Sequence, residues 1–131
     1  EKLGKANGLP VYYLITSPEY LDRQNSLSAV GPSEFISIIS QAEYVVTDSF
    51  HGTIFSINFN RQFDSFAKRE SSESSIDNDR ISCFLKEVHL ENRFKKDDDV
   101  HFEADIEFGE VNKIVSQLRK ESYNYLSLVI E

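Results

Sequence analysis

The segment YVVTDSFHGTIF, residues 44–55, constrains the fold more than any other part of the chain. Its apolar start, Tyr44–Val46, gives way to polar residues at Thr47–Ser49, and a second apolar segment opens at Thr53 after a Phe-His-Gly turn. This pattern predicts a buried strand, a sharp turn and the start of a helix. In open α/β sheets, ligands bind outside the carboxyl ends of strands, and a helix N-terminus favours anions. The segment therefore predicts both an α/β fold and an anion-binding turn.

Length and charge narrow the class of protein. The 131 residues match one domain with a core of its own, so we expect a single domain over 1–131. The net charge of -8 argues against a nucleic-acid or anionic-membrane surface, although a local site can still hold an anionic substrate. No apolar run approaches the roughly 20 residues that span a bilayer, so no membrane span is expected.

Two further features concern the origin of the chain. Cys83 is the only cysteine, which rules out an internal disulfide and fits a reducing compartment, so we expect a cytoplasmic protein, with the inner face of the membrane included as a location. The chain opens at Glu1 and contains no Met. We therefore expect a piece of a longer protein, with residues missing upstream.

Strands and helices alternate along the sequence. Strands are expected at Val11–Thr16, at 44–48, at Gln62–Ala67 and, briefly, near Arg93-Phe94; helices are expected from 31–34 to Ala42, and at Thr53–Asn60, Asp77–Leu90 and Phe108–Ile130. Residues 17–31 and 68–75 are expected to be loops. This order predicts βαβ units and a small parallel sheet. Because parallel sheets are covered on both faces, the chain looks like half of a larger doubly wound protein.

The turn carries the candidate chemistry. His51 can exchange protons near neutral pH, and Asp48 can orient it, stabilise its charge or simply cap the helix. Ser49, Thr53 and the backbone N–H groups of Gly52 and Thr53 can hold an anionic oxygen, and Gly52 allows a ligand to approach the backbone. A histidine at such a turn is more often structural, so the residues alone leave both interpretations open.

A longer stretch carries a resemblance to a known family. Residues 31–63, GPSEFISIISQAEYVVTDSFHGTIFSINFNRQF, resemble the C-terminal signature of the polysaccharide pyruvyl transferase family. Asp79-Arg80-Ile81 with Phe84-Leu85 is similar to that family's Arg-Ile-x-x-Leu-Leu helix, and Leu90–Arg93 is similar to the segment after it. The resemblance covers about half of the chain, roughly residues 30–95.

The resemblance implies an architecture and a reaction. Family members resemble B-type glycosyltransferases, in which two Rossmann-like halves face each other across a cleft. The chain would be the C-terminal half, a three-layer Rossmann-like domain; the N-terminal half is absent, so the fragment alone is expected to be inactive. Members move pyruvate from phosphoenolpyruvate to a sugar of a cell-envelope polysaccharide or its lipid-linked precursor, forming a ketal. No cofactor is implied.

The resemblance also assigns roles to residues. His51 would be catalytic, as the proton donor or as a ligand of the phosphate. The residues expected to bind substrate are Asp48, Ser49, Phe50, Gly52, Thr53 and Arg80. Phe50 is also expected to anchor the core. Arg80 can pair bidentately with a carboxylate or phosphate, or face solvent and pair with Asp77 or Glu87.

Other interpretations stay open. A B-type glycosyltransferase domain would use the same helix start for a nucleotide sugar, a non-catalytic interaction module would have lost its partner half, and a small-anion binding protein is a third class. Asp97–Asp99 can bind a divalent cation, but Lys95 and Lys96 precede this run and a solvated turn is favoured, so no metal is expected. Lys68 and the Ser-rich stretch after it can close over a ligand, although a surface loop is favoured.

Overall fold

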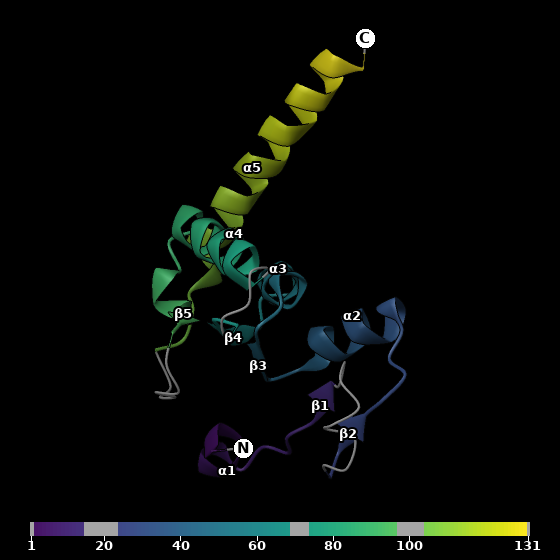
Figure 1. The fold of residues 1–131 in the computed structure, drawn as a ribbon. Coiled ribbons are helices and arrows are strands. Elements are labelled where there is room, and N and C mark those ends of the chain that lie inside the picture. Colours follow the sequence, from purple (N-terminus) through teal and green to yellow (C-terminus); the bar gives the residue numbers. More distant parts are fainter. Residues whose placement is uncertain (1, 15–23, 69–73, 97–103, 131) are drawn as a thin grey trace.

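The computed structural model describes residues 2–14, 24–68, 74–96 and 104–130 (Figure 1). Its elements, in chain order, are α1 (Lys2–Asn7), β1 (Tyr13–Leu14), β2 (Ser26–Leu27), α2 (Pro32–Gln41), β3 (Tyr44–Thr47), α3 (Phe50–Asn58), β4 (Gln62–Phe66), α4 (Ser74–Glu87), a 3-10 turn (Glu91–Arg93), β5 (Phe94–Lys95) and α5 (Phe108–Val129).

The strands form two small parallel sheets. In the larger sheet the order is β3-β4-β5, with Tyr44 opposite Gln62 and Ser65 opposite Phe94. Parallel neighbours need crossover connections, and here α3 joins β3 to β4 while α4 and the 3-10 turn join β4 to β5. β1 and β2 form a separate parallel pair. The predicted α/β, Rossmann-like fold class is confirmed, with its strands divided between two sheets.

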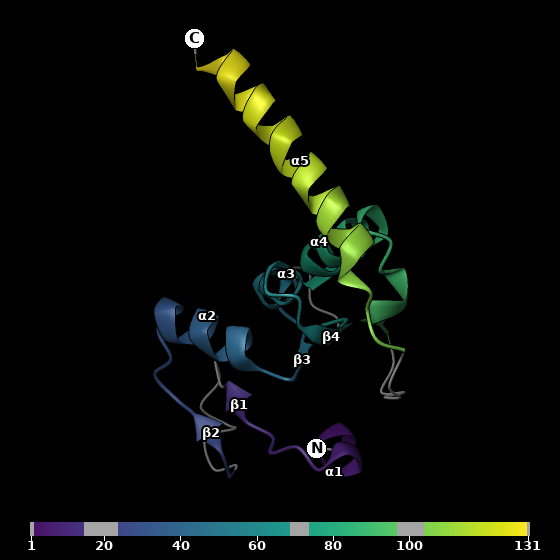
Figure 2. The same cartoon turned by 180° about the vertical axis from the view of Figure 1, so that it is seen from behind.

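The helices gather beside the larger sheet. Figures 1 and 2 show α3, α4 and the first turns of α5 together with β3, β4 and β5, while α1, β1 and β2 are set apart. The C-terminal half of α5 extends away from the other elements and is exposed, including Tyr123, Leu128 and Val129. Among the helices of the described residues, none combines the length and apolar character needed to cross a membrane.

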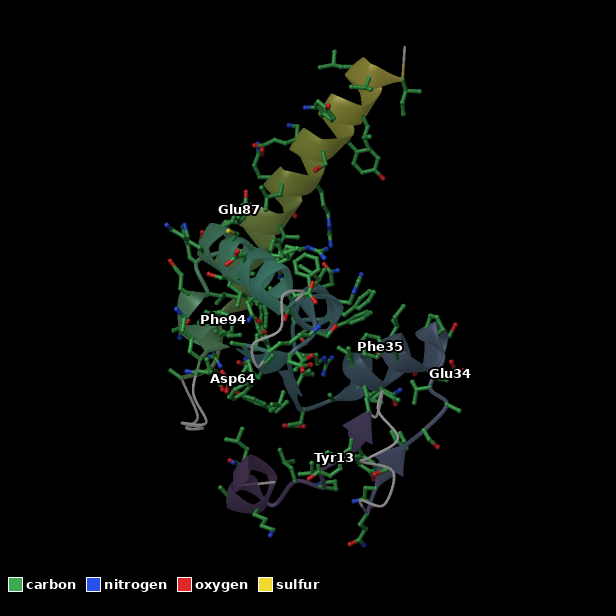
Figure 3. The ribbon with its side chains drawn as sticks, viewed as in Figure 1. Tyr13, Glu34, Phe35, Asp64, Glu87 and Phe94 are labelled. Carbon is green, nitrogen blue, oxygen red and sulfur yellow. The ribbon has the colours of Figure 1, made fainter. Side chains whose placement is uncertain are left out.

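The residues at the start of α2 explain why the helix begins at Pro32. Gly31 is the N-cap, with extended backbone and no side-chain hydrogen bond, and Pro32 occupies the first helical turn. Pro suits this position because its missing N–H is not needed there. Ser33 lies inside the first turn of the helix. The helix contacts α3 through Phe35, whose ring makes an edge contact with Phe55 at a centroid distance of 6.2 Å. Figure 3 labels Phe35 on α2.

Several predicted boundaries differ from the structure. α3 begins at Phe50, not at Thr53, because Ser49 caps it. α4 begins at Ser74 and ends at Glu87, shortly before His89 takes a φ of 60°, which ends the helix. The predicted loop over 17–31 contains β2, and α1 was not anticipated. β1 is confirmed only over Tyr13–Leu14, because the remainder of the predicted strand lies outside the described residues.

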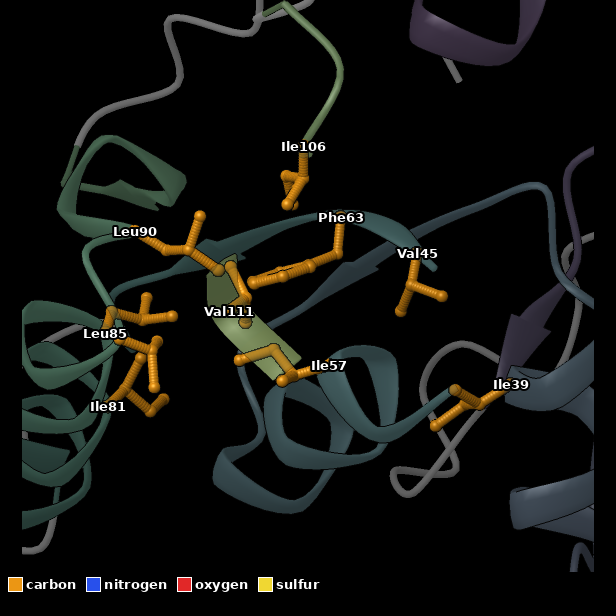
Figure 4. Close-up of a cluster of buried hydrophobic side chains, with 10 residues drawn as sticks. Ile39, Val45, Ile57, Phe63, Ile81, Leu85, Leu90, Ile106 and Val111 are labelled. Carbon is orange, nitrogen blue, oxygen red and sulfur yellow. The ribbon is translucent and has the colours of Figure 1, made fainter. Parts of the chain in front are cut away.

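One apolar cluster joins the sheet to the helices. Phe63 on β4 is fully buried (Figure 4). It is surrounded by Ile57 of α3, by Val111 of α5, and by Leu90 and Ile106, which lie outside the helices. The other members are Ile39, Val45, Ile81, Leu85 and Val88. Fully burying a side chain of this size stabilises the fold by about 1.5–3 kcal/mol. The cluster therefore holds α3 and α4 in place relative to the carboxyl ends of β3 and β4.

A polar network joins β3, β4 and the chain before α5. The fully buried Arg93 donates to the Phe63 carbonyl at 3.3 Å, to the Tyr44 hydroxyl at 3.4 Å and to the Ala104 carbonyl. The Tyr44 hydroxyl in turn donates to Asp64 Oδ2 at 2.8 Å. Burial, and secondarily the Asp64 carboxylate, raises the pKa of Tyr44. The tyrosine therefore stays a neutral donor to Asp64.

Candidate functional site

The turn between β3 and α3 is closed by its own side chains. Ser49 is the N-cap of α3, and its Oγ accepts a hydrogen bond from Gly52 N at 3.4 Å. The Ser49 carbonyl accepts from Thr53 N at 3.0 Å, and Thr47 Oγ1 accepts from Ser49 N at 3.1 Å. Such bonds satisfy N–H groups that a helix start leaves open. The N–H groups of Gly52 and Thr53, which the sequence offered to an anion, thus have internal partners in this structure.

Gly52 and Thr53 pack inside the fold. A Cβ built on Gly52 would overlap Thr47 Oγ1 and lie 3.1 Å from Thr47 Cβ. The absence of a Cβ at Gly52 thus allows the start of α3 to approach Thr47 at the end of β3. From the sequence, this space was expected to admit a ligand. Thr53 is fully buried, and its hydroxyl lies 2.7 Å from Ser65 Oγ on β4. Both residues therefore fix the geometry of the turn, and their substrate-binding role stays a proposal.

His51 lies in the first turn of α3 with an exposed side chain. Its ring makes an edge contact with Phe50, with centroids 6.0 Å apart. Within the described part of the chain, the imidazole makes no hydrogen bond. Asp48, also exposed, does not cap α3 and shows no bond to His51 among the described residues. Its charge instead acts on Lys68, where it contributes to a raised pKa of the ammonium group.

Phe50 links the turn to α4. The guanidinium carbon of Arg80 lies 4.2 Å from the centroid of the half-buried Phe50 ring, within the range of a cation–π contact. The Phe84 ring makes an edge contact with Phe50 at 6.4 Å. Arg80 Nη1 also lies 3.5 Å from Asp77 Oδ1, and its side chain is 51% exposed. The fold thus places Arg80 beside the histidine turn, with half of its side chain open to a ligand.

Lys68 also belongs to this region; from the sequence it can close over a ligand, although a surface loop is favoured. It follows β4, and Nζ lies 2.8 Å from Asp77 Oδ2. Asn78 accepts from Lys68 N at 2.9 Å and donates to Lys68 O at 3.1 Å, which fixes the main chain at this point. The Lys68 ammonium group lowers the pKa of Asp77, with smaller contributions from Arg80 and His51. The signal for Lys68 in the sequence is that a basic residue directly follows the strand expected at Gln62–Ala67.

The site combines basic and acidic side chains at one edge of the sheet. Parallel β3 and β4 end side by side, so residues that follow them lie at the same edge. Within the described residues this edge combines His51, Lys68 and Arg80 with the carboxylates of Asp48 and Asp77. Three basic groups on neighbouring elements can bind a small anion such as a phosphate or carboxylate.

Comparison with protein families yields a match that includes the turn. The model of the family described as polysaccharide pyruvyl transferase matches residues 5–67. Over these residues, just under half of its length, the chain is similar to the polysaccharide pyruvyl transferase family. The matched segment contains Asp48 to Thr53 and ends just before Lys68, so α4 with Arg80 lies outside it. No curated protein and no solved structure matches the chain.

The described residues contain no group of three or more His, Cys, Asp or Glu that could hold a metal ion. The candidate metal run Asp97–Asp99 lies outside the described residues, so the structure does not bear on it. The family match indicates polysaccharide pyruvyl transferase activity in general, and the cluster around His51 is the candidate site.

Proposed function

We propose that the protein transfers pyruvate from phosphoenolpyruvate to a sugar of a polysaccharide or of its lipid-linked precursor. The family match supports pyruvyl transfer to a glycan. The observation that carries the choice of donor is the placement of Arg80 beside the His51 turn, with its guanidinium over Phe50. Phosphoenolpyruvate carries a phosphate and a carboxylate, so it needs cations of this kind.

The reaction begins with protonation of the methylene carbon of phosphoenolpyruvate. The electron pair of the double bond forms the new C–H bond, and the neighbouring carbon becomes oxocarbenium-like. A sugar hydroxyl attacks this carbon and loses its proton, and a second hydroxyl displaces phosphate, which leaves a ketal and inorganic phosphate. His51, exposed at the helix start, is the group that donates the proton or binds the phosphate. General acid catalysis of this kind contributes typically about 10²–10⁴-fold.

The other proposed site residues divide into two groups. Arg80 pairs with the carboxylate or phosphate, and Phe50 holds the guanidinium in place. Ser49, Gly52 and Thr53 form the tight helix start that presents His51 and the positive dipole end to the anion. Asp48, exposed beside them, contributes a negative charge that suits interaction with sugar hydroxyls or with the protonated His51.

The same proposal includes the rest of the protein. We propose that the chain forms one wall of a cleft whose other wall is an N-terminal Rossmann-like half, and we expect the 131-residue chain to be inactive alone. We propose that the protein acts in the cytoplasm, at or near the inner face of the membrane, where lipid-linked precursors are accessible. The lone Cys83, which leaves no internal disulfide, supports it.

The test supplies the intact protein with phosphoenolpyruvate or with nucleotide sugars, together with an acceptor glycan, and measures phosphate release and product mass. Pyruvylated glycan is the expected product. Sugar transfer without pyruvate transfer would instead indicate a B-type glycosyltransferase, and no transfer of either kind would indicate a binding or interaction module.

A matched pair of variants tests the role of His51. His51→Asn should lower kcat by about 10²-fold or more. His89→Asn serves as the control, because His89 is also exposed but sits after α4 with a φ of 60°, which Asn tolerates. Equal pyruvylation rates in His51→Asn and His89→Asn would show that His51 is not catalytic.

A further inference from the structure

We propose that Lys68 is a further anion-binding residue of this site, and that the Asp77 carboxylate competes with the anionic group of the substrate for Lys68 and Arg80. The inference rests on the proposed function for the identity of the substrate, but the anion site can be tested without any turnover. It concerns residues that lie beyond the segment matched by the family.

The geometry around Asp77 is the first argument. One carboxylate oxygen lies 2.8 Å from Lys68 Nζ, and the other lies 3.5 Å from Arg80 Nη1. The two cations therefore face one small anion from two sides. A carboxylate or phosphate oxygen pair of a ligand has similar size and the same preference for N–H donors, so it can replace Asp77 between these groups.

The position of Lys68 is the second argument. β4 lies beside β3 in parallel register, with Thr47 opposite Ser65, so Lys68 leaves the sheet at the edge that carries the His51 turn. The Asn78 side chain holds the Lys68 main chain through two hydrogen bonds. The ammonium group is thus attached to a fixed backbone next to the turn, while its own side chain remains free to change partner.

The ion pairs of Asp77 with Lys68 and Arg80 are open to solvent, so a ligand can replace Asp77. The side chains of Lys68 and Asp77 are 36% and 32% exposed, and that of Arg80 is 51% exposed. Ion pairs with this access to water are weak, because solvent screens them. An anion with two negative charges can therefore displace a single carboxylate from both cations. In this arrangement Asp77 keeps Lys68 and Arg80 oriented and also sets how tightly an anion binds.

The competition predicts effects of opposite sign for two neighbouring variants. Lys68→Gln removes a cation and should weaken binding of inorganic phosphate and of phosphoenolpyruvate by about tenfold. Asp77→Asn removes the competitor and should tighten binding about threefold to fivefold. Lys86→Gln changes an exposed lysine in the last turn of α4 and should leave affinity unchanged.

The experiment is isothermal titration of the intact protein and the three variants with inorganic phosphate and, separately, with phosphoenolpyruvate. Thermal unfolding of each variant checks that it is folded. Opposite shifts in Kd for Lys68→Gln and Asp77→Asn would support the proposal. Equal Kd values for the wild type and Lys68→Gln, weaker binding by Asp77→Asn, or no binding by the wild type would each overturn it.

The outcome also separates this inference from the proposed function. Anion binding that shifts as expected in a protein without pyruvyl transfer would retain Lys68 and reject the reaction. Pyruvyl transfer with an unchanged KM for phosphoenolpyruvate in Lys68→Gln would retain the reaction and reject Lys68.

Discussion

The guanidinium carbon of Arg80 lies 4.2 Å above the centroid of the Phe50 ring, which connects α4 to the first turn of α3. Phe50 immediately precedes His51, so one aromatic ring sets the spacing between the candidate acid and the candidate anion ligand. The Phe84 ring supports it from α4 at a centroid distance of 6.4 Å. This contact makes the position of Arg80 depend on a residue that itself carries no charge.

Replacing Phe50 with Leu should therefore affect both stability and substrate binding. The change removes the cation–π contact and the aromatic edge contact, and we expect the free energy of unfolding to fall by about 1–2 kcal/mol. The KM for phosphoenolpyruvate should rise because Arg80 is less ordered, which steady-state kinetics of the intact protein would show. Phe59→Leu is a suitable control, since Phe59 stacks on Phe55 of the same helix segment without touching Arg80. A similar rise in KM in both variants would contradict the role of Phe50.

Gly52→Ala should destabilise the fold, because its Cβ would overlap Thr47 Oγ1 and lie 3.1 Å from Thr47 Cβ. Overpacking of this kind costs about 1–3 kcal/mol, measured by urea unfolding. Gly109→Ala is the control: a Cβ at Gly109, in the first turn of α5, meets no atom within 4 Å, and it should leave stability unchanged or raise it. Equal effects of the two changes would show that Gly52 is not required by the contact with Thr47.

The local part of the fold could be predicted from the sequence. The apolar run of β3, the polar turn and the apolar start of α3 are neighbours in the chain, so their pattern carries the information. The start of α3 was placed too late because Phe50 and His51 were assigned to the turn. Ser49 supplies an N-cap one residue before Phe50, and the first helical turn tolerates both side chains.

The arrangement of the site could be predicted only in part. The placement of Arg80 over Phe50, and of Asp77 between Lys68 and Arg80, depends on how α4 packs against β4 and α3. The cluster around Phe63, Ile81 and Leu85 determines this packing. No periodicity in the sequence reports such tertiary contacts. β2 was missed for a different reason, because Ser26–Leu27 is too short to show an alternating pattern.

The Lys68–Asp77 pair should make stability depend on pH at both ends of the scale. The pKa of Asp77 is lowered in the folded chain, chiefly by the hydrogen bond from Lys68, so its contribution exists above the unfolded pKa of about 3.9 and disappears as pH falls through the folded value. The pKa of Lys68 is raised, chiefly by Asp77, so its contribution exists below about 10.4 and disappears as pH rises through the folded value.

Unfolding of the wild type and of Asp77→Asn, compared from pH 2 to pH 11, checks this expectation. The stability difference between the two should be constant near neutral pH and should shrink below about pH 4 and above about pH 10. Asp105→Asn, which changes an exposed aspartate outside the cluster, provides the matched control. A difference that stays constant below pH 4 would show that Asp77 titrates alike in the folded and unfolded chains.

Arg93 offers the strongest test of what holds the sheet to the chain before α5. It is fully buried and donates to the carbonyls of Phe63 and Ala104 and to the hydroxyl of Tyr44. Arg93→Met keeps much of the apolar stem but leaves these acceptors without their donor, and we expect a loss of about 2–4 kcal/mol in urea unfolding. Arg119→Met changes an exposed arginine of α5 that makes, among the described residues, a single solvent-exposed hydrogen bond, to Asn58 Oδ1 at 2.7 Å, and it should change stability far less. A loss for Arg93→Met no larger than for Arg119→Met would mean that the apolar cluster alone holds β4 in place, and the His51 edge would then not depend on the network.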